Sequence, residues 1–228
     1  MAQVKSIKGT HDIHGAEMEK FEFIIKKFYS ICRNFNFKSI QTPILEQQDL
    51  FSRTVGEQTD IVSKEMYSFL DKGEAYICLR PEATSSLARF AASNYQSGLL
   101  KLITHGPMFR RERPQKGRYR QFHQINIESI GEKSPYVDFE LILIAKLLFD
   151  DLGIKENKHR LLINSLGSKE DQIKYAYELK KYLTEFKKQL SEISQSRLDK
   201  NPLRILDSKD PKDSEILVNA PKISEHLS

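Results

Sequence analysis

The sequence predicts an α+β fold in which a mainly antiparallel sheet is flanked by helices. Two strand-forming segments, residues 99–109 and 119–128, enclose a basic turn and predict a long hairpin. Two shorter segments, 65–70 and 74–80, flank Asp71-Lys72-Gly73 and predict a second hairpin. Residues 16–35 predict an amphipathic helix whose apolar side covers a sheet. Helices beside antiparallel hairpins are typical of the α+β class.

Composition is that of a soluble globular protein, with 39% hydrophobic and 29% charged residues in 228. No apolar run reaches 18 residues and the first residues lack the apolar stretch of a secretory signal, so we expect a cytoplasmic protein without a membrane span. Cys32 and Cys78 lie in apolar stretches, which predicts buried free thiols. The net charge of +5 permits an anionic partner without requiring one.

The first helix, 16–35, is predicted by apolar side chains that recur every three or four residues. They are Phe21, Ile24, Ile25, Phe28, Ile31 and Cys32. A short strand over 37–46 is expected to run into Pro43, because proline lacks a backbone donor and belongs at a strand's edge or end. Helix 83–95 follows the second hairpin, with Pro81 in its first turn and Glu82 complementing the helix dipole.

Further helices are predicted from their end signals. Ser134 and Pro135 suit the cap and first position of a helix that ends near Gly153. A strand is expected over 158–164. Ser168 and Asp171 then form a near capping box for a helix to about residue 188, and a short helix is expected near 213–219.

The basic turn is the most unusual stretch of the chain. It gathers six cations around a single acid, Glu112: Arg110, Arg111, Arg113, Lys116, Arg118 and Arg120. Arginine binds phosphate through two parallel donors. Strand alternation would place Arg110 and Glu112 on one face with Gln124, Asn126 and Glu128, provided that the register brings them together. Such a face suits a ligand with phosphates at one end and an amine at the other. Composition alone favours a solvated edge hairpin that carries charge against aggregation.

The basic hairpin resembles motif 2 of the class II aminoacyl-tRNA synthetases, an aromatic-Arg-x-Glu strand, a variable loop and a returning strand. The run RRERPQKGRYRQFHQ is similar to that of the histidyl-tRNA synthetases in particular. Other segments resemble the same family: Gly-Thr-x-Asp at 9–12, the Pro43 strand as motif 1, residues 50–56, and Arg-Pro-Glu-x-Thr at 80–84.

The resemblance implies a class II synthetase-like antiparallel sheet, with residues 1–167 as the N-terminal part of the catalytic core and 168–228 as the beginning of a helical insertion. Motif 3, the family's Gly-Leu-Asp-Tyr-Tyr segment and the anticodon-binding domain have no counterpart in the sequence. We therefore expect an N-terminal piece of a longer enzyme, with an incomplete fold, that makes adenylate weakly or not at all.

The implied reaction joins the carboxylate of histidine to the α-phosphate of ATP, giving histidyl-adenylate and pyrophosphate, and then transfers the acyl group to tRNA(His) with release of AMP. The implied partners are histidine, ATP with Mg²⁺ as its substrate complex, tRNA(His), and a second copy bound through motif 1. No prosthetic group is implied. No metal site is expected either, because His11 and His14 lack further ligands at metal-binding spacing.

By family role, Arg110 is the catalytic residue that holds the α-phosphate of ATP. Glu112 accepts from the adenine amino group, and Arg118 reaches the terminal phosphate. Gln115 and Lys116, on the turn, face the acceptor end of tRNA, where Lys116 suits a phosphate.

The histidine pocket is implied by four other residues. Glu82 and Thr84 take the ammonium group, with Gln124 in its polar surroundings. Glu128 forms a hydrogen bond with the imidazole. This explains selectivity for histidine, because an amino acid with an apolar side chain would leave the buried carboxylate of Glu128 unpaired.

Two other classes of function stay open. A noncatalytic synthetase paralogue would act as a histidine- or tRNA-sensing regulatory module, but such proteins tend to lose the motif 2 and pocket residues that are present here. A simple RNA-binding hairpin protein would show salt-sensitive RNA binding without any response to ATP or histidine.

Overall fold

The structure is a computed structural model that describes residues 4–56 and 59–227. The chain divides into two compact units, one ending at His159 and one beginning at Arg160. The first unit contains both sheets, and the second consists of helices and turns. The α+β class predicted from the sequence is therefore confirmed.

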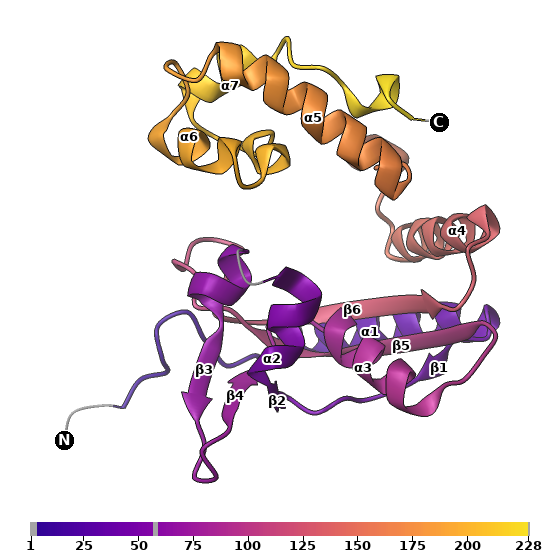
Figure 1. The fold of residues 1–228 in the computed structure, drawn as a ribbon. Helices are drawn as coiled ribbons and strands as arrows, with labels where there is room; N and C mark the ends of the chain where they lie inside the picture. Colours follow the sequence, from indigo (N-terminus) through magenta and orange to yellow (C-terminus); the bar gives the residue numbers. More distant parts are fainter. Residues whose placement is uncertain (1–3, 57–58, 228) are drawn as a thin grey trace. The chain divides into compact units, whose positions relative to one another are not determined.

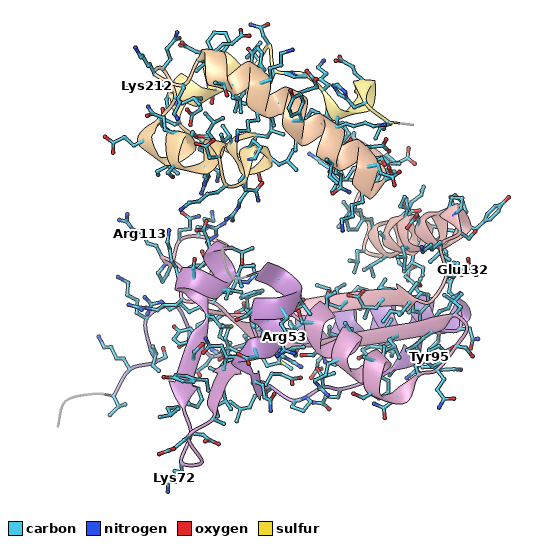
Figure 2. The ribbon with its side chains drawn as sticks, viewed as in Figure 1. Arg53, Lys72, Tyr95, Arg113, Glu132 and Lys212 are labelled. Atoms are coloured by element: carbon cyan, nitrogen blue, oxygen red, sulfur yellow. The ribbon has the colours of Figure 1, made fainter. Side chains whose placement is uncertain are left out.

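The main sheet has the order β1-β5-β6 (Figure 1). Strands β5 (Leu100–Phe109) and β6 (Gln121–Ile130) pair antiparallel along their whole length, from Leu100 opposite Ile130 to Phe109 opposite Gln121. Strand β1 (Lys38–Ser39) lies parallel to β5. The second sheet has the order β2-β4-β3 and is antiparallel: β2 (Leu45–Gln47), β3 (Tyr67–Leu70) and β4 (Tyr76–Leu79). Both predicted hairpins are confirmed, and Lys72 marks the tip of the shorter one in Figure 2.

Helices cover the two faces of the main sheet. Helices α1 (Ala16–Asn34) and α4 (Pro135–Asp151) share one face, where they build a core with odd-numbered strand residues. Its fully or nearly buried members are Phe28, Cys32, Phe37, Ile103, Ile144 and Leu148. Helix α3 (Thr84–Asn94) lies across the hairpin from α1 in Figure 1 and contacts β6 through Thr84. The even-numbered face of β6 is consequently the face that looks toward the start of α3.

The predicted strand over 37–46 is wrong as a single element. Its first part pairs with β5 up to the bond from Ile40 N to Ile103 O, and its last part becomes β2 in the other sheet. Between them, Arg80 Nη1 donates to the carbonyl and the hydroxyl of Thr42 at 3.0 and 2.9 Å. Pro43 follows with no backbone donor. The segment therefore changes sheets at the point where Arg80 holds it.

The start of the helix predicted over 83–95 also differs from prediction. Pro81 and Glu82 precede α3 rather than forming its first turn, because the Glu82 side chain caps the helix from outside. Earlier in the chain, helix α2 (Gln48–Phe51) leads directly into the wide helical turn η1 (Ser52–Gly56), and a separate wide turn, η2 (Ile61–Glu65), precedes β3.

The capping signals around α4 are confirmed. Ser134 accepts from Tyr136 N, Pro135 occupies the first position, and Gly153 follows the helix with a positive φ of 71°. The strand predicted over 158–164 is wrong. The 3₁₀ turn η3 (Glu156–Lys158) is followed by irregular backbone that belongs to neither sheet. A short apolar run such as Leu161–Ile163 does not by itself make a strand, because the backbone also needs a neighbouring strand to bond.

The second unit contains α5 (Lys169–Glu185), α6 (Glu192–Leu198), α7 (Pro211–Leu217) and the 3₁₀ turns η4 (Pro202–Ile205) and η5 (Ile223–Glu225). Ser168 and Asp171 form the predicted capping box of α5. The elements close over a separate apolar core: Tyr175, Leu179, Leu183, Leu190, Leu198, Ile205 and Ile216.

A buried carboxylate ties this helical unit together. Asp213 is 0% exposed and accepts from the Ser191 amide at 2.8 Å, from the Ser191 hydroxyl at 2.7 Å and from the Ser194 hydroxyl at 2.6 Å. The Ser208 hydroxyl donates to it as well. Burial by itself raises the pKa of Asp213, but the donors outweigh burial and lower it to about 2.

We expect Asp213→Asn to lower the free energy of unfolding of the helical unit by about 2 kcal/mol, because an amide donor would then face hydroxyl donors. The folded pKa of Asp213 lies below its ordinary value of 3.8, so its contribution to stability is present above about pH 4 and is lost as the pH falls toward 2. Thermal unfolding followed by circular dichroism at pH 7 and pH 2.5 measures both effects. The matched control is Asp207→Asn, an exposed carboxylate in the same unit. Equal melting temperatures for the two variants at pH 7 would show that the buried carboxylate does not stabilise the unit.

Candidate functional site

The register of the long hairpin places three predicted side chains on one face. Gln124 lies opposite Gly106, Asn126 opposite Thr104 and Glu128 opposite Leu102. Because side chains alternate along a strand, these even-numbered positions of β6 face the same side. All three are half-buried.

Arg110 reaches the same face from the loop. It lies just beyond the end of β5, not within the strand as alternation suggested, and its amide donates to Arg120 O. The Arg110 guanidinium stacks 5.2 Å from the ring centre of Phe122, the next even-numbered residue of β6. Its Nε donates to Pro81 O at 2.9 Å, which leaves the terminal nitrogens as the donors for an anion.

Glu112 and Arg118, predicted at opposite ends of ATP, pair with each other. Arg118 Nε lies 2.7 Å from Glu112 Oε2. The Glu112 side chain is only 12% exposed, whereas that of Arg118 is 57% exposed. The loop turns between Gln115 and Arg118, which exchange two backbone hydrogen bonds, and Gly117 there has a φ of 77°. Gln115 and Lys116 are exposed at this turn, where a large ligand has access to them.

The other end of the face is acidic. Glu82 accepts from the amides of Thr84 at 2.6 Å and Ser85 at 2.9 Å, so its carboxylate caps α3. The Thr84 hydroxyl donates to Glu128 Oε1 at 2.6 Å, across 44 positions of sequence. Burial raises the pKa of Glu128, and the nearby charge of Glu82 adds to the effect, while the Thr84 bond opposes it.

A hollow of about 720 Å³ lies in the helical unit, but a different one borders the acidic end. This second hollow, about 650 Å³, is lined by Thr84, Glu128 and three alanines of α3, Ala88, Ala91 and Ala92. Small side chains leave room beside the Thr84–Glu128 bond for a ligand of amino acid size.

The sequence did not show that Glu65 belongs to this site. Its carbonyl accepts from Arg111 N at 2.6 Å, at the root of the basic loop. Burial raises the pKa of Glu65, the charge of Glu112 raises it further, and Arg110 opposes both. A lone acid at the start of a predicted strand carries no spacing signal, so only the folded chain reveals this neighbour.

The N-terminal loop also packs against the basic loop. Gly9 has a φ of 88°, its carbonyl accepts from Arg120 N at 2.7 Å, and a Cβ there would lie 2.8 Å from Arg120 Cγ and 2.9 Å from Pro114 Cγ. The His11 and Tyr119 rings lie 4.6 Å apart. The glycine signature noted in the sequence thus supports the shape of the basic loop.

Arg80 fixes the position of Pro81 and Glu82. It is 1% exposed, and its Nε donates to Pro107 O at 3.1 Å in addition to its two bonds to Thr42. A Cβ at Gly106 would lie 2.5 Å from Arg80 Nη2, so glycine is needed there for close approach. Burial lowers the pKa of Arg80.

Across residues 4–56 and 59–227, no cluster of three or more histidine, cysteine, aspartate or glutamate side chains has a metal-binding arrangement. In the same ranges, no helix combines the length and the apolar character needed to cross a bilayer.

Solved structures share this fold. The chain matches the crystal structure of apo S. aureus histidyl-tRNA synthetase with a TM-score of 0.75 and 31% identity, over 99% of this chain and 51% of that one. An ATP phosphoribosyltransferase regulatory subunit/histidyl-tRNA synthetase from Bacillus halodurans C matches with a TM-score of 0.60 at 22% identity, over 98% of this chain and 64% of that one, which shows the fold alone. The fold is therefore that of an aminoacyl-tRNA synthetase catalytic region.

The chain belongs to the histidyl-tRNA synthetase family. The family model described as histidyl-tRNA synthetase matches residues 9–199. Similar proteins include the histidine–tRNA ligase of Novosphingobium aromaticivorans, 46% identical over 97% of this chain and 54% of the relative. That of Lactococcus lactis subsp. lactis is 47% identical over 97% of this chain and 52% of the relative. The chain thus spans about half the length of the curated relatives it matches.

Proposed function

We propose that the chain carries the nucleotide- and histidine-binding half of a histidine–tRNA ligase. The observation that supports this most is that one face of the hairpin has a basic end, suited to a phosphate, and an acidic end, suited to an amino acid. Arg110 stacks on Phe122 at one end, and Glu128 bonds Thr84 at the other. Phe122 and Glu128 are six residue steps apart along the strand, about 20 Å, enough for an amino acid beside a nucleotide phosphate.

At the basic end, Arg110 holds the α-phosphate of ATP, which enters with Mg²⁺. The attack of the histidine carboxylate adds charge to that phosphate, and a guanidinium already oriented by Phe122 and Pro81 stabilises it without reorganising. Glu112 accepts from the adenine amino group. Arg118 leaves its ion pair with Glu112 to reach the terminal phosphate, a move that its exposure allows.

At the acidic end, Glu128 accepts from the imidazole N–H of histidine. Glu82, Thr84 and Gln124 surround the ammonium group. The Thr84 hydroxyl orients the Glu128 carboxylate, so the acceptor is in place before the substrate arrives. An apolar side chain in the same pocket would leave that carboxylate without a partner.

The same proposal assigns roles to the exposed loop, to residues 37–46 and to the two parts of the chain. The exposed Gln115 and Lys116 meet the acceptor end of tRNA(His). Residues 37–46 join two copies in a homodimer, and the exposure of Ile44 and Leu45, 39% and 49%, supports an interface there. Residues 1–167 form the N-terminal part of the catalytic core, and 168–228 begin a helical insertion.

We further propose that these 228 residues alone form histidyl-adenylate weakly or not at all, while retaining binding of both substrates. Titration of the chain with histidine and with ATP, followed by NMR, tests the binding proposal. The expected result is saturable binding of each ligand, with shifts at β6 for histidine and in the 110–120 loop for ATP. Salt-sensitive RNA binding with no response to either small molecule would refute the proposal and favour the RNA-binding alternative.

Histidine-dependent ATP–pyrophosphate exchange tests the activity proposal separately. We expect exchange far below that of an intact relative. Exchange at the intact relative's rate would show that the chain is catalytically sufficient. Binding of histidine with no binding of ATP would instead favour a noncatalytic sensing module.

A further inference from the structure

We propose that Asn126 is an additional contact of the bound amino acid, and that its side-chain oxygen accepts a hydrogen bond from the substrate ammonium group. The inference rests on the proposed function, because it extends the histidine pocket by one residue. Nothing in the sequence marks Asn126 as more than a member of the same strand face.

Asn126 occupies the middle of the proposed binding face. It lies between Gln124 and Glu128 on the even-numbered face of β6, about 7 Å along the strand from each. The residue is therefore at the middle of the strip that begins at the Arg110–Phe122 stack and ends at the Thr84–Glu128 bond. A histidine with its carboxylate toward Arg110 and its imidazole toward Glu128 places its amino group over this middle region.

The side-chain oxygen of Asn126 is an unpaired acceptor. Among the residues that the structure describes, Asn126 Oδ1 and Gln124 Oε1 are buried side-chain oxygens without a hydrogen-bond partner. Burying such an oxygen without a donor costs free energy, so the site is incomplete until a donor arrives. Two neighbouring acceptors on one strand suit a ligand group with several donors.

The other residues proposed to contact the ammonium group already take part in hydrogen bonds within the chain. Both oxygens of Glu82 already accept backbone N–H groups of α3, and the Thr84 hydroxyl donates to Glu128. Of the residues predicted to surround the ammonium, Gln124 is the one with a wholly unused oxygen. An ammonium group has three donors. Asn126 supplies the second unused acceptor beside Gln124, whereas the imidazole N–H is better matched by the charged Glu128.

The test compares two ligands on the whole chain by NMR titration: L-histidine, and imidazolepropionate, which lacks the amino group. Asn126→Leu keeps the side-chain size and removes the acceptor. We expect it to weaken L-histidine binding about tenfold and to leave imidazolepropionate binding unchanged. Ser129→Ala, which removes an equally unpaired hydroxyl from the opposite, odd-numbered face of β6, is the matched control and should leave both affinities unchanged.

Asn126→Asp keeps an acceptor at the same position and should retain L-histidine binding even if the leucine variant folds poorly. Equal weakening of both ligands by Asn126→Leu would overturn the inference, because it would indicate packing. Unchanged L-histidine binding would also overturn it, with a buried water as the donor to Asn126 instead, and so would loss of binding in Asn126→Asp. Failure of the unsubstituted chain to bind L-histidine would overturn the proposed function as well, and the two failures are thereby distinguishable.

Discussion

Glu128→Gln is expected to weaken histidine binding at least about 30-fold, because the imidazole N–H loses a charged acceptor in a half-buried site. The side chain keeps its shape, and the Thr84 hydroxyl still has an oxygen to bond. The loss should therefore appear in affinity and not in folding.

The same substitution should leave the unliganded chain as stable at pH 7, or more stable. Burial and the charge of Glu82 raise the pKa of Glu128 above its ordinary value of 4.5. A carboxyl with a raised pKa contributes stability below its ordinary pKa, and that contribution is lost as the pH rises through the folded value. At pH 7 the ionised Glu128 thus costs folding free energy, which a neutral amide avoids.

Histidine affinity should also fall in the unsubstituted chain as the pH is lowered from 7 through the raised pKa of Glu128. Glu128→Gln should lack the part of this pH dependence that comes from protonation of Glu128. The part that comes from the ligand's own imidazole should be the same in both proteins. NMR titrations across pH and thermal unfolding at pH 7 measure the affinities and the stability. Glu132→Gln, an exposed position just past β6 that Figure 2 labels, is the matched control. Equal histidine affinity in Glu128→Gln and Glu132→Gln would exclude Glu128 from the pocket.

Arg110→Ala is the second substitution with a large expected effect, and it should weaken ATP binding at least about 30-fold. The guanidinium is held by the Phe122 ring and by Pro81 O, so its charge is oriented before the phosphate arrives. Arg110→Lys keeps the charge but loses the planar fork, and we expect it to recover only part of the affinity.

Fluorescence titration with a labelled ATP analogue measures this effect. Arg113→Ala is the control, because Arg113 lies in the same loop, is exposed and is labelled in Figure 2, yet has no assigned ligand contact. The loss in Arg110→Ala should shrink only slightly as salt increases, since an oriented and partly buried pair is screened less than a surface charge. Equal losses of ATP affinity in the two alanine variants would show that the loop attracts ATP only through its overall positive charge and that Arg110 makes no specific contact.

Periodicity was sufficient for the elements that pair locally. The alternation from Phe122 to Glu128 gave the correct face, and the caps at Ser134 and Ser168 gave correct helix starts. These signals act over a few residues, so they do not depend on distant parts of the chain.

The errors came from contacts between distant segments. Arg80 redirects the chain at Thr42, which splits the predicted strand over 37–46 between two sheets. The segment 158–164 has strand composition but no paired neighbour in the described ranges. The Thr84–Glu128 bond and the approach of Glu65 to Arg111 likewise depend on tertiary packing, which residue spacing does not encode. Resemblance supplied the roles of the site residues, and the fold supplied their partners.

One face of the β5–β6 hairpin is proposed to bind an amino acid and a nucleotide at adjacent positions. A non-hydrolysable sulfamoyl analogue of histidyl-adenylate tests it directly, because the analogue occupies both positions at once. Calorimetry should show one analogue bound per chain, more tightly than histidine or ATP alone, with the affinity reduced in both Arg110→Ala and Glu128→Gln. An affinity no greater than that of either single ligand, or one that neither substitution changes, would contradict the account.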